Sequence, residues 1–285
     1  MSQESSPKVE AQDPSSERGT ILSLLLENLN DPNPRARVLA VREATDYTDE
    51  VVVDRVLALA DSDPNLEVRC TAISSLGNFV YLGATTVYEL EMDSIYAQDL
   101  LAEADYRRVY DFLLSLYHDE SRTLDERRYA VESLSYASDE TAEQVIAELY
   151  ARPEKEAKIS ALFAMGCSGS VRWEETLRGE FLNEDSDLQI EAIHAAGEMG
   201  AEDLGKDLWR MTYAEDRDTV IAAVWALGQI GWDGAFDRLD ELTLHEDPQI
   251  RECADEAMEE WLFYNGLAQE HGLDEPDTFL DEEES

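Results

Sequence analysis

The sequence predicts an all-α solenoid of about seven helix–turn–helix repeats. The first observation is that similar helical stretches align on a single alanine, with spacings of 32, 58, 31, 31, 31 and 31 residues. These register alanines are Ala40, Ala72, Ala130, Ala161, Ala192, Ala223 and Ala254. The second observation is that no stretch alternates apolar and polar residues as a half-buried strand would. A fixed helical period of this size is typical of a solenoid.

Each register alanine lies on the apolar face of the second helix of a repeat. The residue after it is also apolar, at Val41, Ile73, Val131, Leu162, Ile193 and Val224. Fifteen residues before the alanine, an apolar residue marks a first helix, at Leu25, Leu57, Ile146, Leu177, Leu208 and Leu239. Loops rich in aspartate and proline, such as NDPNP and HEDPQ, separate the two helices. Each repeat is therefore predicted as helix, tight loop and helix.

Two glycine columns follow the register alanine. The first, five residues after it, consists of Gly77, Gly166, Gly197 and Gly228. Glycine inside a helix costs about 1 kcal/mol relative to alanine, which is tolerable where a neighbouring backbone must come close. The second column consists of Gly169, Gly200 and Gly231. Its position suits a left-handed residue that ends the helix.

The spacing of 58 residues indicates an insertion, because it equals one period plus 27 residues. We place this insertion within about 80–107, and nine of the twelve tyrosines lie between Tyr81 and Tyr150. It is either a specificity element on one face of the array or an elongated helix whose tyrosines fill an irregular seam. The repeats are predicted to span 19–265. Residues 1–18 and the acidic segment 266–285 are predicted to be disordered tails.

The charge balance restricts the partners. The chain has 65 acidic and 22 basic residues, a formal net charge of −43. Such a surface repels phosphate backbones and anionic lipids, so we expect neither a nucleic-acid nor a membrane partner. Two interpretations stay open: a protein partner with a basic surface, or the general acidity of proteins from a high-salt cytoplasm. From Asp233 onward there are 19 acidic and 2 basic residues, so this segment is the most attractive to a basic partner.

The residues typical of catalysis do not form recognisable patterns. The four histidines, His118, His194, His245 and His271, show no metal-ligand spacing. The three cysteines, Cys70, Cys167 and Cys253, are far apart and are predicted to be small buried apolar residues in a reducing compartment. The N-terminal segment is polar and lacks the apolar core of a secretory signal. The sequence therefore predicts a cytoplasmic protein with no catalytic residues, metal site or cofactor.

One recurring pattern resembles a known family. The pattern D-P-x-V-R-x-x-A-x-x-A-L-G is best seen in DPNLEVRCTAISSLG and DPQIRECADEAM. It resembles the HEAT repeat, in the short form shared with HEAT-like phycobilin lyases, over about 20–265. The resemblance implies a right-handed superhelical solenoid and a recognition scaffold, but no particular partner. An iron-dependent HEAT enzyme that hydroxylates a modified lysine uses His-Glu pairs, and the matching positions here, such as Cys70-Thr71, lack them.

One column is basic although basic residues are scarce. Three residues before the register alanine lie Arg37, Arg69, Arg127, Lys158, Gln189, Val220 and Arg251. HEAT arrays resemble one another in an arginine near the start of the second helix that hydrogen-bonds loop aspartates. The resemblance therefore implies a structural ladder of Arg37, Arg69, Arg127 and Arg251 with Asp31, Asp63 and Asp247. An alternative interpretation is a cationic stripe.

A candidate partner-binding surface lies on the opposite face of the second helices. With 100° per residue, this face carries positions −1, +2 and +6 relative to the register alanine, and in a HEAT-like array it lines the concave groove. Phe163, His194 and Trp225 occupy position +2 in three consecutive repeats. Tyr129 and Tyr136 occupy positions −1 and +6 of an earlier repeat. Exposed aromatic residues are typical of binding hot spots. The alternative is that they pack between repeats.

These observations favour a non-catalytic scaffold or adaptor that binds a protein partner through the concave groove, with an acidic surface that favours a basic partner. Two other hypotheses are a phycobilin-lyase-like or chaperone-like accessory factor and an acidic decoy of a nucleic-acid-binding protein. The sequence leaves the oligomeric state and the identity of the partner open.

Overall fold

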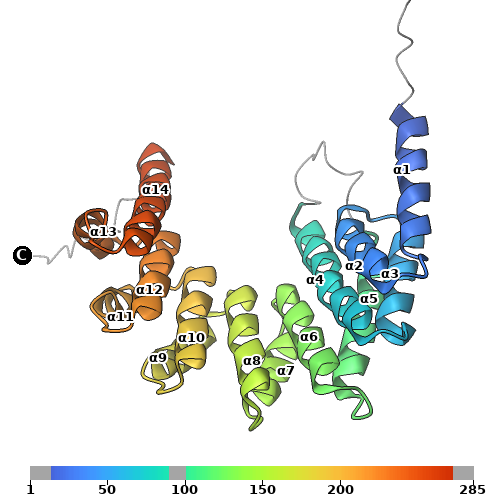
Figure 1. The fold of residues 1–285 in the computed structure, drawn as a ribbon, viewed down its shortest axis with the longest axis horizontal. Coiled ribbons are helices and arrows are strands. Elements are labelled where there is room, and N and C mark those ends of the chain that lie inside the picture. Colours follow the sequence, from blue (N-terminus) through green and yellow to red (C-terminus); the bar gives the residue numbers. More distant parts are fainter. Residues whose placement is uncertain (1–13, 90–100, 272–285) are drawn as a thin grey trace, which may run out of the picture. The chain divides into compact units, whose positions relative to one another are not determined.

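The computed structural model describes residues 14–89 and 101–271, with side chains described for 18–85 and 101–266. All regular elements in these ranges are helical (Figure 1). The α-helices are α1 (Pro14–Asn28), α2 (Pro34–Glu43), α3 (Glu50–Ser62), α4 (Leu66–Glu89), α5 (Glu103–His118), α6 (Leu124–Leu134), α7 (Glu140–Tyr150), α8 (Lys155–Ser168), α9 (Glu174–Glu180), α10 (Ser186–Glu198), α11 (Gly205–Met211), α12 (Arg217–Ile230), α13 (Phe236–Leu242) and α14 (Pro248–His271). Short 3₁₀ helices are η1 (Ala44–Asp46), η2 (Ser135–Ala137), η3 (Val171–Trp173), η4 (Glu202–Leu204) and η5 (Asp233–Ala235). The predicted all-α solenoid is confirmed.

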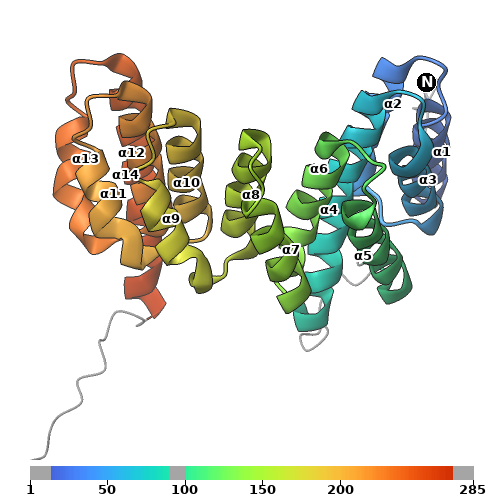
Figure 2. The ribbon, with the colours of Figure 1, turned by 90° about the horizontal axis from the view of Figure 1, so that it is seen from below.

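The described helices follow one another as seven consecutive pairs, from α1/α2 to α13/α14, in agreement with the predicted number of repeats. The chain divides into two compact units, Met1–Ser133 and Leu134–Ser285. In the first unit, α4 packs against α2, α3 and α5. In the second unit, α8, α10, α12 and α14 pack in succession, and α9, α11 and α13 form a layer beside them (Figures 1 and 2).

The register alanines form the centre of the core, because all seven are buried. The apolar residues that follow them are buried as well, in both units. In the first helices, the column that lies fifteen residues before the register alanine is less regularly buried. Leu57 is half-buried, and its neighbour Val56 is buried instead. The period of the sequence therefore predicts the buried residues of the second helices correctly and those of the first helices to within one residue.

The second glycine column ends helices as predicted. Gly169, Gly200 and Gly231 have φ angles of 62°, 67° and 60°. In this left-handed region an L-residue with a Cβ is strained, whereas glycine is not. In these three repeats the chain therefore turns out of the second helix at the same position and enters the next repeat after the same interval.

The insertion lengthens a helix. Helix α4 has 24 residues and extends to Glu89, well inside the segment 80–107. The ring of Tyr106 at the start of α5 lies against Gly83 of α4, at the position where a Cβ would be. This contact agrees with the interpretation of an elongated helix with tyrosine in the seam, although Tyr81 is exposed. Residues 90–100 lie outside the described residues.

Helices extend into both segments that were predicted to be disordered tails. Helix α1 begins at Pro14, and proline is favoured in the first turn of a helix because its fixed φ is already helical. Helix α14 extends to His271. The remaining parts of the predicted tails, 1–13 and 272–285, lie outside the described residues. Within the described part of the chain, no helix is both long and apolar enough to cross a membrane.

Candidate functional site

The candidate site lies on helices α8, α10 and α12 of the second unit. The first glycine column lets these helices and the following α14 approach closely. A Cβ on Gly166 would lie 2.8 Å from the Cα of Ala195, and a Cβ on Gly228 would lie 2.7 Å from the Cα of Ala257. A Cβ on Gly197 would lie 2.6 Å from the Trp225 ring. The glycines therefore bring equivalent positions of successive helices side by side.

The three aromatic residues predicted at position +2 come together. Phe163, His194 and Trp225 line one pocket of about 470 Å³, between α8, α10 and α12. The rings of His194 and Trp225 are 5.2 Å apart and nearly perpendicular, which is a favourable edge-to-face arrangement. Phe163 remains 37% exposed, and the other two are half-buried. The aromatic residues therefore pack between repeats and also present a surface to solvent.

Polar and aliphatic side chains complete the pocket. Glu191 and Glu198 of α10 line it on either side of His194, and Ile221 and Ala222 form part of its apolar wall. The prediction missed these residues because it selected only aromatic ones. The signal was present, since Glu191 and Ala222 occupy position −1 and Glu198 position +6 of their repeats.

The histidine and the cysteine of the pocket favour their neutral forms. Burial lowers the pKa of His194, and the nearby charge of Glu198 opposes this effect only in part. Burial and Glu256 raise the pKa of the Cys253 thiol to about 11. At neutral pH the imidazole is therefore mostly uncharged, and the thiol is protonated and a poor nucleophile.

The structure does not place the two predicted tyrosines in this pocket. Tyr129 of α6 belongs to the first unit and lines another pocket of about 490 Å³, together with Arg42, Cys70 and Ser74. The guanidinium of Arg128 stacks over its ring at 4.2 Å. Tyr136 lies in η2 and is half-buried. Of the five residues predicted as one surface, Phe163, His194 and Trp225 line a common pocket.

The cysteines are less buried than predicted. Cys70, Cys167 and Cys253 are reduced cysteines of intermediate exposure. They lie near the outer edge of second helices, not on the register face, which explains their partial exposure. In the described residues, histidine, cysteine and carboxylate side chains do not gather into a group of three or more that could hold a metal ion.

The arginine column makes one ladder contact of the predicted kind. Arg37 donates to both carboxylate oxygens of Asp63 in the following repeat, from Nε and Nη2, each at 2.8 Å. Burial raises the pKa of Asp63, but the hydrogen bond from Arg37 and a backbone hydrogen bond from Asn65 outweigh burial and lower it. This buried, bidentate pair links the first two repeats.

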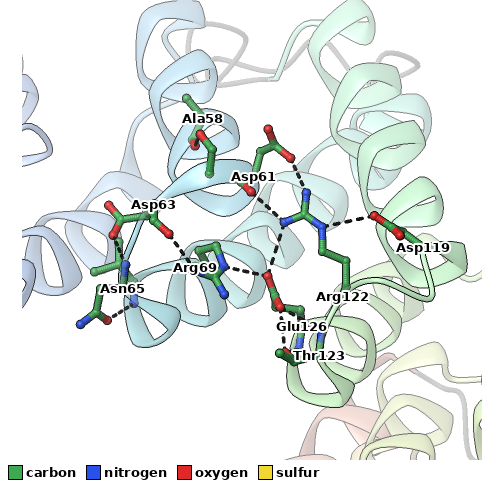
Figure 3. Close-up of polar contacts among 11 residues, drawn as sticks. Ala58, Asp61, Asp63, Asn65, Arg69, Asp119, Arg122, Thr123 and Glu126 are labelled. Carbon is green, nitrogen blue, oxygen red and sulfur yellow. Dashed lines mark hydrogen bonds and ion pairs between the residues drawn. The ribbon is translucent and has the colours of Figure 1, made fainter.

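The next arginine pairs with a different carboxylate. Arg69 donates to the Asp63 backbone oxygen at 2.8 Å and to Glu126 Oε1 at 2.7 Å (Figure 3). Glu126 also accepts hydrogen bonds from the backbone N–H and the hydroxyl of Thr123, and Arg122 approaches its carboxylate. The network therefore joins α4 to α6 through glutamate instead of a loop aspartate.

The other predicted ladder residues contact backbone groups. Arg127 donates to the Tyr117 carbonyl at 2.7 Å, and Arg251 donates to the His245 carbonyl at 2.8 Å. The Asp31 carboxylate accepts the Asn33 N–H, and the Asp247 carboxylate accepts the Gln249 N–H. The common role of these arginines is thus to satisfy carbonyls of the helix–helix loop, and the aspartates form local turns. In the described residues, Arg37 and Asp63 are the predicted ladder members that pair with each other, whereas Asp247 pairs at 3.3 Å with Arg217, which lies outside the predicted column.

Comparisons with known proteins support the repeat assignment. The model of HEAT repeats matches residues 22–90, and the model of the PBS lyase HEAT-like repeat matches residues 220–245. The second match contains Ile221, Ala222 and Trp225 of the pocket. A search of curated protein sequences gave no significant match.

Two solved structures share the fold. The complex of CpcE and CpcF of phycocyanin lyase from Nostoc sp. PCC7120 is similar with a TM-score of 0.52 and 18% identity, over 92% of this chain and 100% of that chain. Importin beta is similar with a TM-score of 0.54 and 14% identity, over 93% of this chain. The match spans 39% of the importin beta chain. At these identities the similarity concerns the fold alone.

Proposed function

Because the chain is built of HEAT repeats, we propose that it is a non-catalytic scaffold that binds a protein partner through the pocket of Phe163, His194 and Trp225. The observation that carries the proposal is the partly exposed aromatic surface of this pocket. Aromatic side chains held in place by surrounding packing bury a large area at small entropic cost, which makes them suitable anchors for a partner.

The chemistry of the pocket supports a binding role over a catalytic one. A nucleophilic mechanism needs a side chain activated by a neighbouring base. Cys253 is the thiol among the lining residues, and burial and Glu256 disfavour its thiolate. Its sulfur lies 3.5 Å from the Ile221 carbonyl, to which the thiol donates. This arrangement stabilises the protonated thiol.

The proposal predicts that Phe163→Ala with Trp225→Ala weakens partner binding at least tenfold. Partners would first be identified by affinity capture from native lysate with mass spectrometry. Binding of the purified partner would then be measured for wild type and variant.

Leu182→Ala with Leu244→Ala is the matched control, since it removes two exposed apolar side chains outside the pocket, 86% and 85% exposed. Circular dichroism and thermal melting must show that the double variant is folded. If it unfolds, the single variant Trp225→Phe takes its place in the binding measurement. Unchanged affinity in a folded pocket variant would contradict the proposal.

A second candidate function is a lyase-like or chaperone-like accessory factor for a chromophore protein. The match of 220–245 to the PBS lyase HEAT-like repeat favours it, because this segment forms one wall of the pocket. The volume of about 470 Å³ also lies in the range of small-molecule sites. Incubation with a bilin and an apo-subunit, followed by absorbance spectroscopy, decides this alternative. A covalent adduct formed faster with the protein than without it would support the accessory role.

A further inference from the structure

We propose that a second surface of the protein, on the loops before its last three second helices, binds a basic amphipathic α-helix of another protein. This surface is separate from the pocket, and the inference goes beyond the function proposed for the pocket.

The surface is a row of apolar side chains at one position of three consecutive repeats. Ten residues before the register alanine lie Leu182, Tyr213 and Leu244, in the loops that join α9 to α10, α11 to α12 and α13 to α14 (Figure 1). We call these three residues the loop row. All three are exposed, and the two leucines are almost entirely so. The first four repeats carry Asn30, Ser62, Glu120 and Ala151 at this position.

A glutamate accompanies each residue of the loop row. Two residues further along the chain lie Glu184, Glu215 and Glu246, and all three are exposed. Within the described part of the chain, none of these glutamates forms a hydrogen bond or an ion pair. Their carboxylates are therefore available to a partner. The first four repeats have Pro32, Pro64, Arg122 and Pro153 at this position.

The fold explains the aspartates beside these glutamates but not the glutamates themselves. Asp185, Asp216 and Asp247 each accept a backbone N–H at the start of a second helix, at 3.1, 2.8 and 2.9 Å. Such a cap stabilises the helix by satisfying a donor that has no partner inside it. The exposed leucines and the glutamates make no comparable contribution to the fold. A shared binding role accounts for their recurrence together in three repeats.

Tyr213 gives the loop row a fixed centre. Its ring lies 5.1 Å from the ring of Trp209, and the guanidinium of Arg238 stacks over it at 3.8 Å. Arg238 adds little free charge beside the row, because its side chain is 10% exposed and pairs with Glu241 at 2.7 Å. An aromatic side chain held in this way loses little entropy on binding, so it is a suitable anchor for a partner.

The spacing of the loop row fits an α-helix. Helices α10, α12 and α14 pack in succession, so the loops before them follow one another at the helix-packing distance of about 8–10 Å. Seven residues of an α-helix rise about 10.5 Å, so one apolar face of a helix can contact all three row residues. An extended peptide needs a strand edge for its backbone hydrogen bonds, and the described elements are all helical. A helix satisfies its backbone groups internally.

The charge of the surface selects a basic helix. The unit Leu134–Ser285 carries 39 acidic and 10 basic residues, a net charge of −29, so it attracts a basic partner before contact. The glutamates beside the loop row then lie next to lysine or arginine side chains that flank the apolar face of the helix. A second copy of this chain is disfavoured as the occupant, because two molecules with a net charge of −43 repel each other.

The test uses the intact protein and a labelled peptide of about 18 residues, long enough to form a helix and to span three repeats. Leucine at every third or fourth position gives the peptide one apolar face, and lysine flanks this face. One control peptide has the same composition in an order without an apolar face, and another has glutamate instead of lysine. By fluorescence anisotropy, we expect saturable binding of the first peptide, at least tenfold tighter than that of either control.

A pair of apolar variants tests the loop row itself. Leu182→Ala with Leu244→Ala should weaken binding of the lysine peptide at least tenfold, because two buried contacts with the helix are lost. Val171→Ala with Leu262→Ala is the matched control, since it removes apolar side chains that are exposed elsewhere in the same unit. The control should change binding less than twofold. Circular dichroism checks that both variants are folded.

A pair of charge variants separates recognition at the row from general attraction. Glu184→Gln with Glu215→Gln and Glu246→Gln should weaken binding of the lysine peptide about fivefold. The control removes the same charge from exposed positions in α7, η4 and α14, by Glu140→Gln with Glu202→Gln and Glu260→Gln, and should change binding less than twofold. Equal effects of the two variants would overturn the inference.

The remaining outcomes are also decisive. Absence of saturable binding, equal binding of the scrambled peptide, or unchanged affinity in folded Leu182→Ala with Leu244→Ala would overturn the inference. Self-association of the protein alone, lost in the same variant during sedimentation, would overturn it too, because a second copy would then cover the row. These failures leave the pocket proposal intact, since Leu182→Ala with Leu244→Ala should not change binding at the pocket.

Discussion

Gly166 controls how closely α8 and α10 approach. A Cβ at this position would lie 2.8 Å from the Cα of Ala195 and 3.0 Å from its carbonyl oxygen. Both are backbone atoms of a packed helix, so they cannot move aside as a flexible side chain could. The absence of one methyl group thus allows the helix contact that aligns Phe163 with His194.

We predict that Gly166→Ala destabilises the protein by about 1–3 kcal/mol, because overpacking outweighs the gain of about 1 kcal/mol in helix propensity. Gly179→Ala in α9 is the matched control, since a Cβ there meets no atom within 4 Å. The control should be neutral or slightly stabilising. Urea unfolding midpoints compare the two variants, and equal midpoints would show that the close approach is not required.

At the scale of the element, α6 begins with a reciprocal cap that also links it to α4. The Glu126 carboxylate accepts the Thr123 N–H, and the Glu126 N–H donates to the Thr123 hydroxyl, as in a capping box. Arg69 extends this cap into a contact between repeats. Burial raises the pKa of Glu126, but the hydrogen bonds from Arg69 and Thr123 outweigh burial and lower it to about 2.

The lowered pKa of Glu126 predicts a loss of stability in acid. The ordinary value is about 4.5, so the contribution of the ionised carboxylate is complete above this pH and is lost as the pH falls toward 2. After allowance for solvent screening, we expect a loss on the order of 2 kcal/mol. Glu126→Gln should flatten this part of the stability–pH curve. Glu103→Gln, an exposed glutamate paired with Arg107, is the control and should leave the curve unchanged.

At the scale of the whole molecule, the net charge of −43 makes like-charge repulsion a general opponent of the folded state. We predict that the urea midpoint rises between 0.1 and 1 M NaCl, because salt screens this repulsion. Sucrose at equal osmolality serves as the control for preferential exclusion. A midpoint that is independent of NaCl, or that rises equally in sucrose, would show that the acidity does not limit stability.

The sequence predicted which residues belong to the site better than it predicted which of them lie together. The +2 column placed Phe163, His194 and Trp225 on one face. Their repeats have equal spacing, so position +2 points in the same direction in each of the three second helices. It also grouped Tyr129 and Tyr136 with them, although Tyr129 lies in a different pocket of the first unit. Position along a repeat fixes the direction of a side chain but not its neighbours. Glu191 and Glu198 shared the same face and became relevant only when the pocket brought them beside the aromatic rings.

The sequence by itself determined the all-α repeat architecture, its period, the buried alanine face and the glycine helix ends. These features follow from local propensity and helical periodicity, which operate within one repeat. The tertiary structure decided which carboxylate each arginine meets, as with Arg69 and Glu126, and how far α1, α4 and α14 extend. It also decided that three aromatic residues and two glutamates line one pocket. Those outcomes depend on distances between repeats, which are set by the packing of helices from different parts of the chain.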